Sequence, residues 1–207
     1  MIERCETFDF LGVVFDQFIT WNDHIKKLHQ KLSYSLYQMR KIKNLLNYDN
    51  LKRLYYSIVH SHIEYGMLLW SNTSTKNINI IQKLQKRALR IVHKVGYNHP
   101  TEQLLQNANI LNIEKTIDKH MYVLMYRYTN DQLPRSIRNL FICNQDVHQY
   151  HTRQKNNPHI KKHKRQTTLN SFLHKSPLKW QNLPISLKNK PSKSCFVNKI
   201  KKYLMTN

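Results

Sequence analysis

Apolar side chains recur every three or four residues over most of the chain. From residue 25 to residue 46 this spacing predicts one long helix with a single buried stripe. The stripe consists of Ile25, Leu28, Leu32, Leu36, Met39 and Leu46. Thr20 and Asp23 have a spacing like that of a capping box, so we expect the helix to begin beside them. Lysine and arginine side chains occupy its other faces.

Two further helices follow with the same periodicity. Asp49 is a candidate N-cap for a helix that ends near Gly66. Its inward positions are Leu51, Leu54, Ile58 and Val59. Thr73 or Ser74 is a candidate N-cap for the next helix, and Gly96 is its expected C-terminal stop. The inward positions of that helix are Ile78, Ile81, Leu84, Ala88, Ile91 and Val95.

Shorter elements complete the pattern. Residues 7–15 are rich in aromatic and β-branched types and are interrupted by Gly12, which predicts a short strand or hairpin. We expect a short helix from Thr101 and a longer one over residues 113–128. Near the C-terminus, Phe196, Ile200 and Leu204 recur every four residues and predict a last helix over 196–205.

The fold class predicted is mainly α, with a small N-terminal β element, a helical bundle and a basic, partly disordered C-terminal extension. We place the β element at 1–22, the helical domain at 23–130 and the extension at 131–207. Residues 144–170 are predicted as a loop, because 148–165 are polar and basic with almost no apolar side chains. Order is expected to return around Trp180, which lies among apolar residues.

The charge is strongly positive and unevenly distributed. The chain carries 34 Lys and Arg against 12 Asp and Glu, a formal net charge of +22. All carboxylates lie at or before Asp146, whereas 14 Lys and Arg follow it. A phosphate backbone is the expected partner, because cationic side chains release its condensed counterions. A basic tail that only keeps the chain soluble remains the alternative.

The cations gather at two places. On the helix expected to begin at Thr73 or Ser74, one stripe alternates with the apolar stripe, and it contains Lys83, Lys86, Arg87, Arg90 and Lys94. The second patch contains Lys161, Lys162, Lys164 and Arg165. We predict that both contact nucleic-acid phosphates. An ordinary solvated face is the alternative for the helical stripe.

Several classes of site are disfavoured. The three glycines are far apart, so the glycine-rich loops of nucleotide-binding folds are missing. The three cysteines are also far apart, which argues against a disulfide framework and suits a reducing compartment. The first residues lack the apolar stretch of a signal peptide, and no apolar run is long enough to span a bilayer. We therefore expect an intracellular protein, in nucleus or cytoplasm, without a membrane partner.

Catalytic and metal chemistry is equally sparse. His159 and His163 have the spacing of half a zinc finger, but no paired cysteines accompany them. Two-metal phosphoryl transfer needs clustered carboxylates, and the chain has no two adjacent acidic residues. We expect no catalytic residue, metal or cofactor in this chain.

Short motifs follow one another in a fixed order along the chain. The series begins with Phe10-Leu11-Gly12-Val13, followed by Asp16, Trp21 and His24. It continues with His62-Ile63-Glu64-Tyr65-Gly66 and Trp70, and with Arg87-Ala88-Leu89-Arg90-Ile91. It ends with Pro177-Leu178-Lys179-Trp180-Gln181-Asn182-Leu183-Pro184 and Ser194-Cys195-Phe196. This series resembles the region after the palm in reverse transcriptases of non-LTR (LINE-type) retrotransposons, although that family usually has Gly-Pro where this chain has Ser176-Pro177.

The resemblance implies roles. Phe10, Leu11 and Gly12 would belong to a primer-grip-like element, and the helices after them would form a thumb that clamps the template–primer duplex. The fingers and the palm, with its catalytic aspartates and magnesium, would belong to the upstream part of the parent RNA-directed DNA polymerase. Alone, this chain is expected to bind RNA, DNA or an RNA–DNA hybrid without sequence specificity and not to polymerise.

Two other functions remain open. The chain could be a free-standing basic RNA-binding protein with no enzymatic parent, or the inert product of a decayed element. The sequence identifies neither a stacking platform nor a reader of the 2′-hydroxyl, so it indicates no preference between RNA and DNA.

Overall fold

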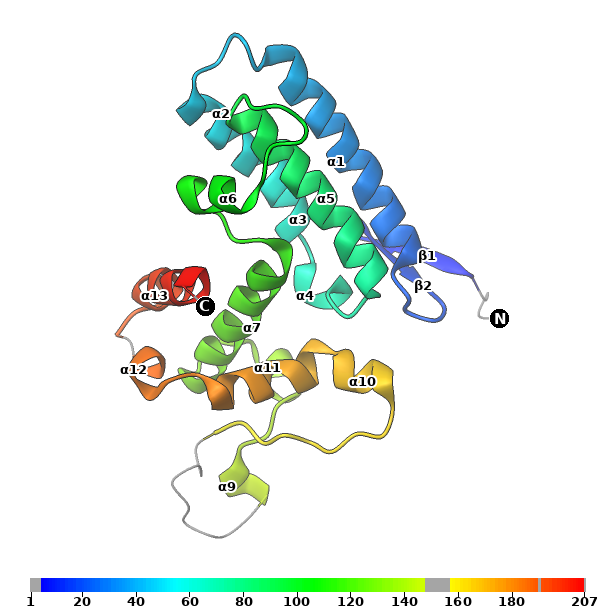
Figure 1. Ribbon diagram of the computed structural model, residues 1–207. Helices are drawn as coiled ribbons and strands as arrows, with labels where there is room; N and C mark the ends of the chain where they lie inside the picture. Colours follow the sequence, from blue (N-terminus) through cyan, green and yellow to red (C-terminus); the bar gives the residue numbers. More distant parts are fainter. Residues whose placement is uncertain (1–4, 148–156, 190, 207) are drawn as a thin grey trace. The chain divides into compact units, whose positions relative to one another are not determined.

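The computed structural model describes residues 5–147, 157–189 and 191–206 (Figure 1). Its first element is an antiparallel hairpin. Strand β1 (Thr7–Phe10) pairs with β2 (Val13–Asp16), and Phe10 lies opposite Val13. Leu11 and Gly12 between them have φ values of 50° and 83°. Two positive φ angles are those of a type I′ turn, which matches the twist of the strands. The predicted hairpin is confirmed, and Gly12 lies in its turn.

The Asp16 carboxylate organises the entry into the first helix, α1 (Asn22–Ile42). It accepts hydrogen bonds from the backbone N–H groups of Phe18, Thr20 and Trp21 at 3.1, 3.0 and 2.7 Å. The Thr20 hydroxyl also donates to it, at 3.2 Å. The predicted capping box is therefore wrong: Trp21 is the N-cap residue, and its side chain caps no backbone group.

The following helices form a bundle with α1. They are α2 (Tyr48–Tyr55), the π-helical turn η1 (Tyr56–His60), α3 (Ser61–Glu64), α4 (Met67–Trp70), α5 (Thr75–Val92) and α6 (Glu102–Ala108). Asn47, and not Asp49, caps α2 by accepting from the N–H of Asn50. Ser74 caps α5 by accepting from the N–H of Asn77, as one of the two predicted caps.

Helices α1 and α5 lie side by side and run in the same direction (Figure 1). Their N-termini are joined, because the Asn77 amide donates to the Asn22 side-chain oxygen at 2.8 Å. The predicted inward stripes of both helices are buried, with one exception at the end of each. Leu46 lies beyond the end of α1, and Val95 lies beyond the end of α5.

Two of the motifs that carry the family resemblance, Phe10–Val13 and His62–Gly66 with Trp70, meet where the hairpin joins the helices. The Tyr65 hydroxyl donates to the Leu11 carbonyl, and the buried Trp70 indole donates to the Tyr65 carbonyl at 3.0 Å. Gly66 has a φ of 61°, and a Cβ placed there would come within 3.1 Å of Val13 Cγ2. These residues therefore secure the hairpin to the bundle, which explains why a glycine is needed at position 66.

The chain forms two compact units, Met1–Thr116 and Ile117–Asn207, and the boundary lies within α7 (Ile113–Thr129). The second unit continues with α8 (Arg135–Arg138), α9 (Asn144–Val147), α10 (Gln166–Asn170), α11 (Phe172–Asn182), α12 (Ile185–Lys188) and α13 (Lys193–Thr206). The division into 1–22, 23–130 and 131–207 stays a prediction.

Aromatic packing holds the second unit together. Phe196 of α13 stacks on Tyr126 of α7 with ring centroids 4.4 Å apart. The ring centroid of Trp180 in α11 lies 5.9 Å from that of Phe196. Ile200 and Leu204 of α13 are buried with them. The last predicted helix is thus confirmed and begins three residues before the predicted start, at Lys193.

The predicted loop over 144–170 needs a partial correction. Its residues 148–156 lie outside those described, but both of its ends are helical, as α9 and α10. The Asp146 carboxylate accepts from the Cys143 N–H at 3.2 Å, which closes the first turn. Such one-turn helices bury too little to leave an apolar periodicity in the sequence. No helix in the described residues combines the length and apolarity that a membrane span requires.

Candidate nucleic-acid interface

Helix α5 presents the predicted cation stripe on its outer face. Lys83 and Lys94 are exposed, and Lys86, Arg87 and Arg90 are half-buried. The opposite face holds the buried Ile81, Leu84 and Ala88. The sequence pattern thus separated the two faces of this helix correctly.

The C-terminus of α5 is a Schellman motif whose left-handed residue is Lys94, with a φ of 55°. The N–H of Val95 donates to the Arg90 carbonyl at 3.0 Å, and the N–H of Lys94 donates to the Ile91 carbonyl at 3.1 Å. These two bonds define the motif, which usually has glycine at the left-handed position. The prediction that Gly96 stops the helix is therefore wrong, because the chain turns at Lys94.

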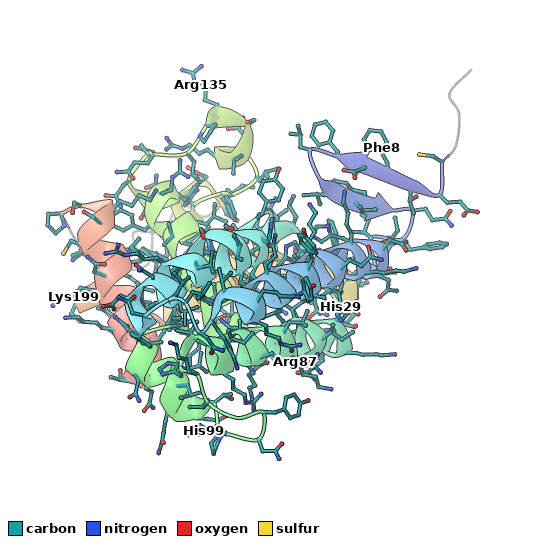
Figure 2. All side chains as sticks on the ribbon, turned by 90° about the horizontal axis from the view of Figure 1, so that it is seen from above. Phe8, His29, Arg87, His99, Arg135 and Lys199 are labelled. Atoms are coloured by element: carbon teal, nitrogen blue, oxygen red, sulfur yellow. The ribbon has the colours of Figure 1, made fainter. Side chains whose placement is uncertain are left out.

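After this turn the chain returns along α5. The Arg90 Nε donates to the His99 carbonyl at 3.0 Å, and the Tyr97 ring lies beside two guanidinium groups of the stripe. The Arg87 and Arg90 guanidinium carbons are 5.9 and 5.5 Å from the centroid of that ring. Figure 2 shows Arg87 on its helix and His99 in the adjoining loop. Sequence reasoning missed Tyr97, because its position depends on the unpredicted turn.

Lys86 differs from the other members of the stripe because an acid lies next to it. Its Nζ is 3.5 Å from a carboxylate oxygen of Glu102, the first residue of α6. The backbone N–H of Glu102 and the charge of Lys86 together lower the pKa of this carboxyl group. Lys83 and Lys94 form no salt bridge with a described residue, and both are exposed, so their ammonium groups are accessible to a phosphate.

The second predicted patch lies in the second unit. Lys161, Lys162, Lys164 and Arg165 are all exposed on the segment before α10. Lys161 also lines a pocket of about 120 Å³ that includes three histidines. The two predicted patches thus belong to different units, five cations in the first and four in the second.

The primer-grip-like residues lie at the tip of the hairpin. Phe10 is 55% exposed and Leu11 is 74% exposed, while Gly12 donates its N–H to an Asp9 carboxylate oxygen at 3.0 Å. Phe8, which sequence reasoning did not select, stacks on Phe10 with centroids 6.3 Å apart (Figure 2). Strand β1 of the hairpin therefore carries two exposed aromatic rings. By contrast, Trp21 is buried, as the large apolar area of an indole ring favours.

The negative charge of Asp9 on the hairpin is balanced by a neighbouring cation. Asp9 forms an ion pair with Lys27 of α1. The hydrogen bond that the Lys27 ammonium donates lowers the pKa of the Asp9 carboxyl group. Lys27 is therefore engaged, whereas its neighbours Lys26 and Lys31 on α1 are exposed.

A magnesium site does not fit the described residues. No three His, Cys, Asp or Glu side chains gather among them in a group able to hold a metal ion. His60 and Glu64, four residues apart, bring Nε2 and Oε1 to 3.2 Å. We derive no metal-dependent step for this chain.

Comparison with known proteins gives one informative match. Over 114 residues the chain is 26% identical to a protein of Drosophila melanogaster described as a probable RNA-directed DNA polymerase from transposon BS. The match covers 54% of this chain but 13% of the length of that protein. No family model and no solved structure matches the chain. The match supports a relationship to a transposon reverse transcriptase.

Proposed function

We propose that this chain is the segment that follows the palm in a non-LTR retrotransposon reverse transcriptase, and that it binds template–primer duplex through phosphates. The single observation that carries the binding proposal is the cation face of α5, where Lys83 and Arg87 lie opposite the buried face of the helix and the exposed Lys94 follows in the turn at its C-terminus. The match to a transposon polymerase and the ordered motifs support the placement within the parent enzyme.

The chemistry of this face suits backbone recognition. A polymerase must accept any sequence, so its duplex contacts go mainly to phosphates and sugars. Cations at helical spacing on one face can follow a phosphate backbone without reading base edges. The hairpin with Phe10, Leu11 and Gly12 would act as the primer grip, and the palm with its magnesium ions would lie in the rest of the parent protein.

The first test is a salt titration of binding to an RNA–DNA hybrid duplex, with a primer-extension assay on the same sample. We expect affinity in the range of about 10⁻⁶ to 10⁻⁴ M that falls steeply with salt, and no extension. Binding that does not depend on salt, or none at low salt, would contradict the proposal.

A charge-reversal pair locates the interface. The triple variant Lys83→Glu, Arg87→Glu and Lys94→Glu should abolish detectable binding. The matched control Lys26→Glu, Lys31→Glu and Arg40→Glu makes the same charge change on exposed positions of α1. If both triple variants lose the same affinity, net charge alone explains binding and the α5 stripe is an ordinary solvated face.

A further inference from the structure

We propose that Tyr97 is a stacking platform for an unpaired base next to the duplex, which extends the proposed function and depends on it. The Tyr97 side chain is 67% exposed, although two guanidinium groups lie within 6 Å of its ring centroid. Tyrosines that serve the core are buried in this protein, as Tyr55 and Tyr126 are. Tyr97 therefore contributes little to the core and offers most of its ring surface to a ligand.

The ring is held in place before any ligand arrives. The Schellman turn at Lys94 reverses the chain, and the N–H of His99 donates to the Gly96 carbonyl at 3.2 Å. The Arg90 Nε then secures the loop through the His99 carbonyl at 3.0 Å. A preorganised aromatic side chain loses little entropy on binding, so more of the stacking free energy appears as affinity.

The neighbouring groups indicate which ligand fits. Every base has a π face, and proteins that bind single strands combine aromatic rings with cations that hold the backbone. Arg87, 5.9 Å from the ring centroid, and the exposed Lys94 at the start of the loop can bind the phosphates next to a stacked base. Bases inside a duplex are already stacked on each other, so the ring can act only on unpaired nucleotides. The site therefore favours a single-stranded overhang, such as unpaired template.

The test compares two ligands on the full chain by fluorescence anisotropy: a blunt RNA–DNA hybrid and the same hybrid with a short unpaired template overhang. Tyr97→Ala should weaken binding to the overhang ligand roughly 5- to 150-fold, the loss expected for one stacked base. It should leave blunt-duplex affinity within about twofold. Tyr97→Phe should bind like the native chain, because stacking does not need the hydroxyl group.

Tyr34 provides the matched control, because it is 64% exposed on α1 and makes no ring contact among the described residues. Tyr34→Ala should affect neither ligand. As a direct readout, the emission of a Tyr97→Trp variant should be quenched by the overhang ligand and not by the blunt duplex.

Three outcomes would overturn the proposal. Tyr97→Ala could weaken both ligands equally, Tyr34→Ala could weaken overhang binding as much, or Tyr97→Ala could change nothing. If the native chain binds blunt duplex with salt sensitivity but shows no added affinity for the overhang, only the platform fails. If the native chain binds neither ligand, the proposed function fails as well.

Discussion

Replacing Lys94 by glycine should make the protein more stable and its duplex binding weaker. Lys94 occupies the left-handed position of the Schellman motif, with a φ of 55°. That conformation costs an L-residue about 1–2 kcal/mol, whereas glycine adopts it without a steric penalty. Glycine also loses about 0.5–1 kcal/mol more backbone entropy on folding. The expected net gain in the free energy of unfolding is therefore about 0.5–1 kcal/mol.

The binding effect has the opposite sign because the same substitution removes an exposed cation. Each duplex phosphate contact contributes about 0.9 to the slope of log K against log salt concentration. Lys94→Gly should reduce that slope by about this amount. The Lys94 side chain is exposed and forms no salt bridge with a described residue, so its charge is available to a phosphate.

Two assays separate the effects, and Lys94→Ala is the matched control. Urea unfolding followed by circular dichroism gives stability, and a salt titration of hybrid-duplex binding gives the slope. Lys94→Ala removes the same charge but keeps the strain, so it should lose the slope without gaining stability. If the glycine variant is no more stable than the alanine variant, the left-handed assignment of Lys94 is refuted.

Three further predictions concern buried or strained groups. Burial and the charges of Lys27 and Lys31 lower the pKa of the His24 imidazole in the folded protein. Between pH 6.5 and this lowered pKa, His24 is protonated in the unfolded chain but neutral in the folded one. Stability should therefore fall as pH drops below about 6.5, by at most about 1.4 kcal/mol per pH unit for this group, and urea midpoints of His24→Gln should show a smaller drop. Gln85→Leu leaves the buried Tyr55 hydroxyl and Leu111 carbonyl without their shared donor. It should lower the free energy of unfolding in urea by about 1–3 kcal/mol. The control Gln82→Leu, at a half-exposed position of the same helix, should leave it unchanged. Leu11→Asn should relieve the left-handed φ of the turn and raise the free energy of unfolding by up to about 1 kcal/mol, which should raise the thermal midpoint. An unchanged midpoint would contradict the type I′ assignment.

The sequence predicted the elements whose residues repeat with a strong period. The stripes of α1 and α5 bury side chains every three or four residues over several turns, so one atypical residue does not obscure the period. The ends were predicted less well, because they depend on single hydrogen bonds. Asp16 binds the N–H groups of residues that precede α1, where a cap at Thr20 was expected. Asn47 replaced Asp49 in α2, since any nearby oxygen can satisfy the first N–H groups of a helix.

The candidate site was predictable as a set of charges but not as a geometry. Periodicity placed Lys83 and Arg87 on the outer face of α5. It could not show that Glu102, which belongs to the next helix, lies near Lys86. Nor could it bring Tyr97 beside Arg90, because the reversal takes place at a lysine in a position where glycine is the usual residue.

The hairpin also determines how this protein behaves at high concentration. Within the described residues β1 pairs only with β2, and its exposed outer edge carries unpaired backbone groups next to Phe8 and Phe10. Such an edge can recruit a strand from another molecule. With a net charge of +22, copies repel one another at low ionic strength. Salt removes this repulsion as well as the proposed attraction to nucleic acid, so we expect the free protein to self-associate at the salt concentrations that should release a bound duplex.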